Sequence, residues 1–236
     1  MQEQKPFINP EWFARFYRKV EPRILLLFEE RAYRSVARSG KVERERRIMN
    51  ARYRKIKGAR AAVALVGIGA PATAVATDVL IALGAKELVF FGSAGSIVPE
   101  LSIGDVCVCT KAFPDDGTSR AYVPDASFFA ASERLTADLK RALDTTKEIA
   151  VFSTDAFFME TPDKVERFRR TGACGVEMEA AAVFAIAQRR GVEAAGVLVI
   201  SDRIHEKGWT AGFWDPRFIV AVRSARKKLL AWLESA

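Results

Sequence analysis

The sequence predicts an α/β protein with a single domain over residues 1–236, built on a mixed, largely parallel central sheet flanked by helices. Three observations support this. Half of the 236 residues are hydrophobic, which is enough for one large core. The apolar runs that suit strands are apolar on both faces, as in parallel strands covered on both sides. Helical patterns alternate with these runs along the chain.

The first quarter of the chain is predicted to be basic and mostly helical. A helix is expected at 10–20 and a buried strand at 24–28, and a basic helical stretch then runs to about Lys57. Residues 15–60 hold 16 Lys and Arg but only 5 acidic residues, whereas the whole chain has a net charge of +8. No helix-turn-helix, zinc or aromatic stacking motif accompanies this charge. We therefore expect a solvated helix face in this N-terminal segment (about 10–57) and no nucleic-acid partner.

The rest of the chain alternates between buried strands and helices. The remaining strands are expected at 61–69, 87–97, 103–113, 148–158 and 194–202. The remaining helices are expected at 71–85, 131–144, 180–187 and 218–235, and 115–124 is expected to be a loop.

Composition argues against several classes of protein. The three cysteines are an odd number, and two of them alternate on an apolar strand (DVCVC), so they are interpreted as reduced core thiols of a cytoplasmic protein. A metal site is not expected, since His205 is the sole histidine and there is no CxxC motif. No apolar run approaches the roughly 20 residues that span a bilayer, so no membrane partner is expected. The N-terminus lacks the basic-then-apolar order of a signal peptide.

Special residues gather where the predicted strands end. Gly67 and Gly69 follow one strand, Gly92–Gly95 another, 153–158 a third, and Ser201-Asp202 the last. In parallel sheets the binding crevice lies at the carboxyl ends of the strands. The sequence therefore predicts an active site at this edge.

Two carboxylates stand at the start of the buried helix at 180–187. Glu177 and Glu179 either complement the helix dipole or, since burial demands donors, accept hydrogen bonds from a vicinal diol such as a sugar. Asp202 has two interpretations of equal weight, a turn aspartate or a general acid that protonates a leaving group.

Two further features remain ambiguous from the residues alone. The GSAGS loop, with Ser93, can place backbone N–H groups against an oxyanion, but any tight turn uses glycine. Phe157 belongs either to the core or to the lip of the crevice, where it would stack on a flat base.

The motifs, taken together, match a known family. GIGAPATAVATDVLIALGAKELVFFGSAGSI, IGDVCV, DDGTSRAYVP, STDAFF and GVEMEAAAVFAIA followed by VLVISD occur in this order from about Ile24 to Ser201 and beyond. The chain resembles the nucleoside phosphorylases of the purine nucleoside and uridine phosphorylase superfamily, the branch that forms trimers and hexamers.

The resemblance implies roles for the sugar and base half of the site. Glu179 would hold the ribose 2′- and 3′-hydroxyls while Met178 packs on the sugar, and Glu177 would lie beside the base or ribose. Phe157 would stack near the base. Asp202, in the Ser201-Asp202 pair, would protonate N7 of a departing purine.

The resemblance also implies that inorganic phosphate is the co-substrate, with no metal or organic cofactor, and that the chain forms a homo-oligomer of dimer units, as a trimer or hexamer. Ser93, with Gly92, would contact the phosphate. Arg47 would reach the site of a neighbouring subunit.

The phosphate half departs from the family pattern. The two positions expected to carry phosphate-binding arginines are Ala32 and Phe90, although Arg31 lies beside the first. Losing two charge-assisted donors would weaken phosphate binding by roughly two to four powers of ten. Phe28 and Phe90 would make the same pocket more apolar.

Three functions therefore remain open. The first is phosphorolysis of a purine nucleoside, with a phosphate site rebuilt from arginines such as Arg31, Arg34, Arg47 or Arg120. The second is hydrolysis of the same bond by water, or cleavage of a nucleotide. The third is nucleoside binding without turnover, although retained Glu179 and Asp202 argue against it.

Overall fold

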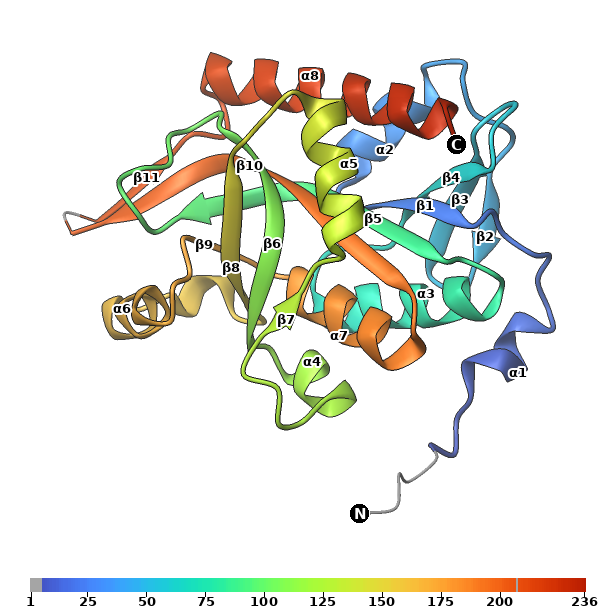
Figure 1. Cartoon of the computed structure of the whole chain (residues 1–236), viewed down its shortest axis with the longest axis horizontal. Helices are drawn as coiled ribbons and strands as arrows, with labels where there is room; N and C mark the ends of the chain where they lie inside the picture. Colours follow the sequence, from blue (N-terminus) through green and yellow to red (C-terminus); the bar gives the residue numbers. More distant parts are fainter. Residues whose placement is uncertain (1–5, 207) are drawn as a thin grey trace.

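The computed structural model describes residues 6–206 and 208–236, and at its centre lies one mixed sheet of eleven strands (Figure 1). The strands are β1 Arg23–Leu27, β2 Arg46–Ile48, β3 Ala51–Lys55, β4 Ala61–Leu65, β5 Glu87–Ser96, β6 Val106–Asp115, β7 Phe129–Ala130, β8 Glu148–Thr154, β9 Gly175–Glu177, β10 Glu193–His205 and β11 Gly208–Ala211. The helices are α1 Pro10–Ala14, α2 Glu30–Ala37, α3 Ala70–Ala82, α4 Gly117–Tyr122, α5 Glu133–Leu143, α6 Pro162–Arg170, α7 Ala180–Arg190 and α8 Pro216–Glu234, with a 3-10 turn at Phe157–Met159.

Parallel pairing organises the middle of the sheet. β1 lies between β4 and β5, parallel to both, and β10 runs parallel to β5 on its other side. These strands are apolar on both faces because each face is covered, and Ile24, Leu25, Leu26 and Leu27 are all fully buried. The predicted fold class is confirmed.

The sheet also closes on itself at one end. β10 pairs with β6, β6 with β8, β8 with β9, and β9 returns to β5. This ring brings the carboxyl ends of β5 and β8 next to β9, and the end of β5 lies beside Asp202 and Arg203 near the end of β10. The site described below lies there.

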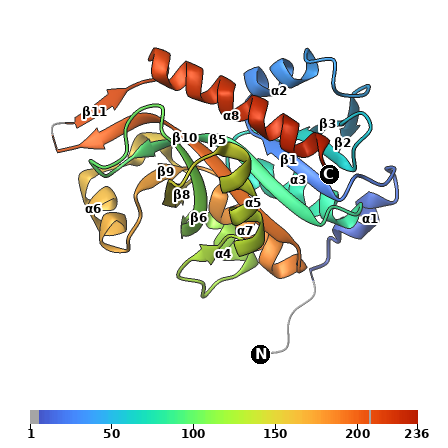
Figure 2. The same ribbon diagram turned by 45° about the horizontal axis from the view of Figure 1, so that its top comes forward.

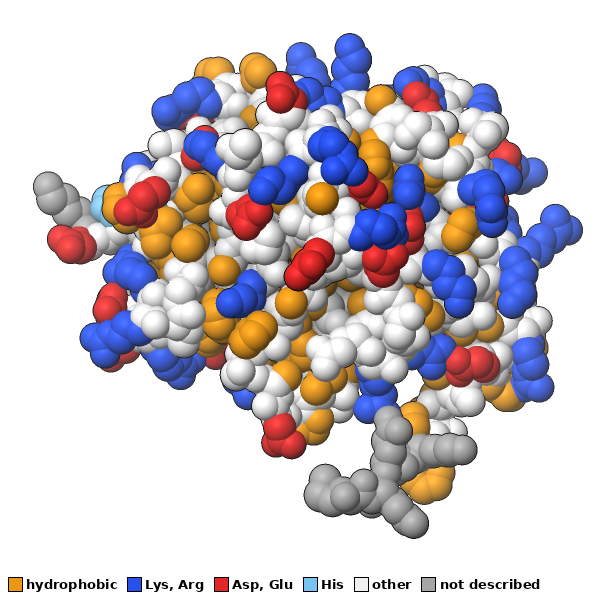
Figure 3. All heavy atoms as spheres, in the orientation of Figure 1, with side chains coloured by type: hydrophobic (Ala, Val, Ile, Leu, Met, Phe, Trp, Pro, Cys, Tyr) orange, Lys and Arg blue, Asp and Glu red, His pale blue; other side chains and the backbone are white. Residues whose placement is uncertain are grey.

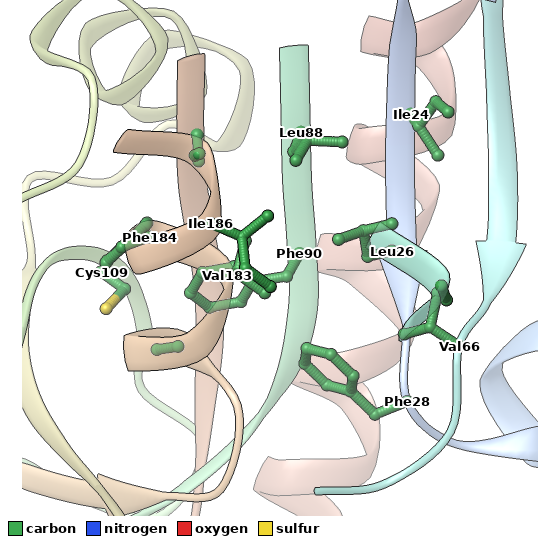
Figure 4. Close-up of a cluster of buried hydrophobic side chains, with 14 of the residues drawn as sticks. Ile24, Leu26, Phe28, Val66, Leu88, Phe90, Cys109, Val183, Phe184 and Ile186 are labelled. Atoms are coloured by element: carbon green, nitrogen blue, oxygen red, sulfur yellow. The ribbon is translucent and has the colours of Figure 1, made fainter. Parts of the chain in front are cut away.

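Helices cover the sheet in two layers (Figure 1, Figure 2). α3 and α7 pack together on one face, whereas α2, α5 and α8 lie on the other. In Figure 4, Phe90 of β5 points toward α7 and packs against Phe184, with ring centroids 5.5 Å apart. Gly196 of β10 makes room for it, since a Cβ there would lie 1.9 Å from the Phe90 ring.

The expectation of a basic helical segment over about 10–57 is wrong for much of its length. Helices occupy only Pro10–Ala14 and Glu30–Ala37, and β2 and β3 form a hairpin at the edge of the sheet. In this hairpin Ala51 and Tyr53 are buried, and Arg52 and Arg54 lie on the other face of β3.

Much of the segment's charge is paired within the chain. Arg52 binds Glu30 at 2.6 Å and Glu45 at 3.0 Å, and Lys55 binds Glu21 at 2.9 Å. The face in Figure 3 shows basic side chains dispersed among acidic and uncharged ones. This distribution favours the expected solvated surface.

Several smaller elements were not predicted, among them α4, α6, β7, β9 and β11. Residues 117–122 form α4 where a loop was expected, because Asp116 caps the helix by accepting from the Ser119 N–H at 2.6 Å. α6 was not expected, and β10 continues past Asp202 to pair with β11. Within residues 6–206 and 208–236, no helix is both long and apolar enough to cross a membrane.

Candidate functional site

A cleft of about 270 Å³ lies where the sheet closes. β5 contributes Gly92–Gly95, β9 and the start of α7 contribute 176–179, and β10 contributes Ser201 and Asp202. Phe157 and Glu160 close another side, together with Phe28 and Phe213. The predicted convergence of the strand ends is therefore present in the structure.

Glu177 is committed to contacts within the protein. Its Oε1 accepts from the Ser153 hydroxyl, and its Oε2 accepts from the backbone N–H of Glu179 at 2.8 Å and of Ala180 at 2.7 Å. Ser153 in turn accepts from the Ala181 N–H at 2.8 Å. These contacts satisfy N–H groups at the start of α7 that have no partner inside the helix. They support the helix-terminus interpretation of Glu177, and its proposed contact with base or ribose remains a prediction.

Glu179 differs from Glu177, although it lies two residues away. Its Oε1 accepts from the Gly69 N–H at 2.6 Å, and the backbone N–H of Met178 also stabilises the ionised carboxylate. Gly69 has φ of 91°, a conformation that favours glycine, and this lets the N–H at the start of α3 reach the carboxylate. Because Glu179 also lines the cleft, it is the carboxylate with a lone-pair edge available to a ligand.

The two carboxyls influence each other's protonation. Burial raises the pKa of Glu177 and of Glu179, and the neighbouring Glu177 charge raises the pKa of Glu179 further. Two backbone N–H groups that can only donate face Glu177 Oε2, so Glu177 is the better placed to stay ionised. Of the two carboxyls, Glu179 therefore has the greater tendency to hold a proton and Glu177 the greater tendency to stay ionised.

A strand bulge, two hydrogen bonds and a neighbouring glycine hold Asp202 at the cleft. The β5–β10 register shifts between Ile200 and Asp202, and such a bulge re-aims the side chain. Asp202 Oδ1 accepts from the Ser201 hydroxyl at 2.6 Å, and Oδ2 accepts from the Trp209 indole N–H at 2.8 Å. A Cβ at Gly95 would lie 2.8 Å from Oδ2, so glycine there permits the close approach. The sequence predicted that Asp202 ends its strand, and this is wrong because β10 continues to His205.

The end of the cleft that is predicted to hold the base includes two groups that the sequence did not single out. Glu160 follows the 3-10 turn, and burial followed by the Asp202 charge raises its pKa to about 7. Phe213 lies between β11 and α8 and also lines the cleft. Phe157 lines it as expected and is 41% exposed, and Met178 lines it beside Glu179. A carboxylate just after STDAFF was the one available signal for Glu160.

The end of the cleft that is predicted to hold phosphate is apolar on one side. Ser93 and Gly92 line the cleft, and Phe28 packs so closely that a Cβ at Gly92 would lie 3.1 Å from its ring. Phe90, in contrast, is fully buried and points away into the core (Figure 4). Of these two phenylalanines, Phe28 alone lines the cleft, so the expectation that Phe90 would make this end apolar is wrong.

The candidate phosphate arginines lie at different places. Arg31 lines a neighbouring cavity that also contains Ser93, and Arg34 lines it while paired to Glu30 at 2.6 Å. Arg47 lies on β2 at the sheet edge and lines neither cavity. Arg120 lies on α4 and donates to the Pro114 carbonyl at 2.6 Å.

Comparison with known proteins identifies the family of the chain. A family model described as the phosphorylase superfamily matches residues 24–234. The chain belongs to this superfamily. The guanosine phosphorylase of Halorubrum lacusprofundi is 32% identical over 171 residues, which cover 68% of this chain and 67% of that protein. The DeoD-type purine nucleoside phosphorylase of Caldanaerobacter subterraneus subsp. tengcongensis is 29% identical over 162 residues, covering 63% of this chain and 66% of that protein. The match thus spans about two thirds of each relative.

Solved structures share the phosphorylase fold. The purine nucleoside phosphorylase of Toxoplasma gondii in complex with immucillin-H has a TM-score of 0.77 at 21% identity, covering 100% of this chain and 98% of that chain. The 5′-methylthioadenosine/S-adenosyl homocysteine nucleosidase of Helicobacter pylori has a TM-score of 0.76 at 24% identity, covering 93% of this chain and all of that chain. Both phosphorylases and nucleosidases thus use this architecture.

Proposed function

We propose that the protein is an enzyme that cleaves the N-glycosidic bond of a purine nucleoside by phosphorolysis. The observation that carries the proposal is that Glu179, which accepts fewer hydrogen bonds from the protein than Glu177 does, and Asp202 line the same cleft. Membership of the phosphorylase superfamily and the two relatives named as phosphorylases support it.

Each half of the cleft has a defined task in the proposed reaction. Glu179 accepts hydrogen bonds from the ribose 2′- and 3′-hydroxyls, and Met178 packs against the sugar. Asp202 gives a proton to N7 of the purine as the bond between C1′ and N9 breaks. Phosphate at Ser93 and Gly92 forms the new bond to C1′, so the products are free base and ribose 1-phosphate. No metal or organic cofactor takes part.

A homo-oligomer in the cytoplasm is part of the same proposal. Apolar side chains next to residues of the cleft are well exposed: Phe158 at 93% and Met159 at 59% lie between Phe157 and Glu160 in the chain, and Trp209 at 54% bonds to Asp202. A neighbouring subunit would cover them and bring its Arg47 to the site. The folding unit is a single domain.

Hydrolysis is the second candidate, and the phosphate end carries it. Ala32 and Phe90 occupy positions where phosphate-binding arginines were expected, and Phe28 makes that end apolar. Water would then attack C1′, giving ribose and free base.

Product analysis separates the two reactions. Inosine, adenosine, guanosine and uridine are each incubated with the protein in phosphate and in phosphate-free buffer. Phosphorolysis predicts free purine and ribose 1-phosphate only when phosphate is present. Free base and ribose in both buffers would establish hydrolysis, and no base from any nucleoside would contradict the proposed function.

A further inference from the structure

A second, larger cavity of about 690 Å³ lies between α2 and α8, helices on the same face of the sheet (Figure 1, Figure 2). It shares Glu29, Gly92, Ser93 and Phe213 with the proposed nucleoside cleft, so the two cavities adjoin at the end proposed to bind phosphate. Five arginines line it, and we call it the arginine groove: Arg31, Arg34, Arg38, Arg223 and Arg226.

Most of these arginines have no acidic partner. Among residues 6–206 and 208–236, the guanidinium groups of Arg31, Arg38, Arg223 and Arg226 make no hydrogen bond or ion pair. Elsewhere arginines are commonly paired, as Arg52 is with Glu30 and Glu45. The groove therefore concentrates positive charge that the protein itself does not neutralise.

The carboxylates nearby do not change this balance. Glu29 and Glu30 line the groove, but Glu30 already binds Arg34 and Arg52, each at 2.6 Å. Burial and the charges of Arg223 and Arg31 lower the pKa of Arg226, which shows that these cations repel one another. A groove of this kind is stabilised when an anion occupies it.

We propose that the arginine groove binds a ligand that carries at least two phosphate groups, one of them at Ser93 and the others between α2 and α8. Four unpaired arginines against Glu29 leave an excess of three positive charges, more than one orthophosphate neutralises. The groove also extends from Ser93 to Arg226 on α8, well beyond a single phosphate site. Its occupancy does not require the N-glycosidic cleavage proposed above.

Direct binding measurements test this without reference to turnover. Isothermal titration calorimetry and thermal unfolding are run with inorganic diphosphate, orthophosphate and guanosine diphosphate at constant ionic strength. We expect diphosphate to bind at least about tenfold more tightly than orthophosphate and to raise Tm. Tighter binding of guanosine diphosphate than of diphosphate would identify an organic diphosphate as the ligand. Equal affinity for orthophosphate and diphosphate would overturn the proposal.

Variants on α8 locate the binding. Arg223→Gln and Arg226→Gln should each weaken diphosphate binding about tenfold, because each removes a charge-assisted donor. Lys227→Gln is the matched control, since it removes the same charge from the adjacent position of α8 outside the groove. Equal losses in Arg226→Gln and Lys227→Gln would reduce the effect to general electrostatics and overturn the proposal.

A second readout distinguishes ligand binding from a structural role. Without anions, Arg226→Gln should unfold at the same or a higher temperature than the wild type, because repulsion from Arg223 and Arg31 is relieved. With diphosphate, the wild type should become the more stable of the two. A variant that is less stable in both conditions, or one that changes the oligomeric state while keeping diphosphate affinity, would assign these arginines to packing or to a subunit contact instead.

Discussion

Glu177 and Glu179 allow one substitution to be compared at two neighbouring positions with opposite expected results. In Glu177→Gln, an amide that can donate from one end replaces a carboxylate whose two oxygens accept from Ser153 and from two backbone N–H groups. At least one buried donor loses its acceptor, and such a loss costs about 1–3 kcal/mol. The free energy of unfolding should fall by that amount.

In Glu179→Gln the amide oxygen can keep the bond from the Gly69 N–H, so the fold should retain its stability. What is lost is the charged Oε2 that accepts from the ribose hydroxyls. A loss of about 2–4 kcal/mol in transition-state binding corresponds to roughly 30- to 700-fold in kcat/KM.

The assay combines urea unfolding with steady-state kinetics on a purine nucleoside and on its 2′,3′-dideoxy analogue. Glu179→Gln should reduce kcat/KM for the nucleoside far more than for the analogue, which has no diol to bind. An equal reduction for both substrates would refute the role of Glu179. Wild-type stability in Glu177→Gln would refute the role of Glu177 at the start of α7.

Three further predictions concern the proton from Asp202, the titration of Glu179 and the packing of Gly196 against Phe90. Asp202→Asn should lower purine release by about two or more powers of ten, because an amide cannot supply the proton, and should change nucleoside affinity little. Rapid-quench kinetics measure the release and calorimetry measures the affinity. Unchanged turnover would remove Asp202 from the reaction. Nucleoside affinity should weaken as pH falls through the raised pKa of Glu179, because only the ionised carboxylate accepts from both hydroxyls. The same profile should persist in Glu160→Gln, and its disappearance there would assign it to Glu160 instead. Gly196→Ala should destabilise the protein by about 1–3 kcal/mol in thermal unfolding, because the new Cβ overlaps the Phe90 ring. Adding Phe90→Leu to this variant should restore part of the lost stability. An unaffected Tm in Gly196→Ala would contradict this packing.

The central strands were predictable because burial on both faces leaves a continuous apolar run. The β2–β3 hairpin was missed because its outward arginines dominate the composition, although the alternation of buried Ala51 and Tyr53 with Arg52 and Arg54 was present in the sequence. A helical interpretation of a basic stretch should therefore be checked against a period of two.

Part of the candidate site was predictable because glycines and polar residues follow the apolar strands. This pattern indicates the carboxyl edge of the sheet, where Glu179 and Asp202 lie. Trp209 could not be found in this way, since its bond to Asp202 depends on β11 folding back on β10. The direction of Phe90 was also out of reach, because alternation along β5 says that Phe90 and Phe91 point to opposite faces but not which face holds the site.

A crystal structure of the protein with a purine nucleoside bound would test the proposed cleft directly. We expect the ribose 2′- and 3′-hydroxyls within hydrogen-bonding distance of Glu179 Oε2 and the purine N7 beside Asp202, with C1′ facing Ser93. A nucleoside bound elsewhere, or one whose ribose points away from Glu179, would contradict the proposed cleft and the function assigned to it.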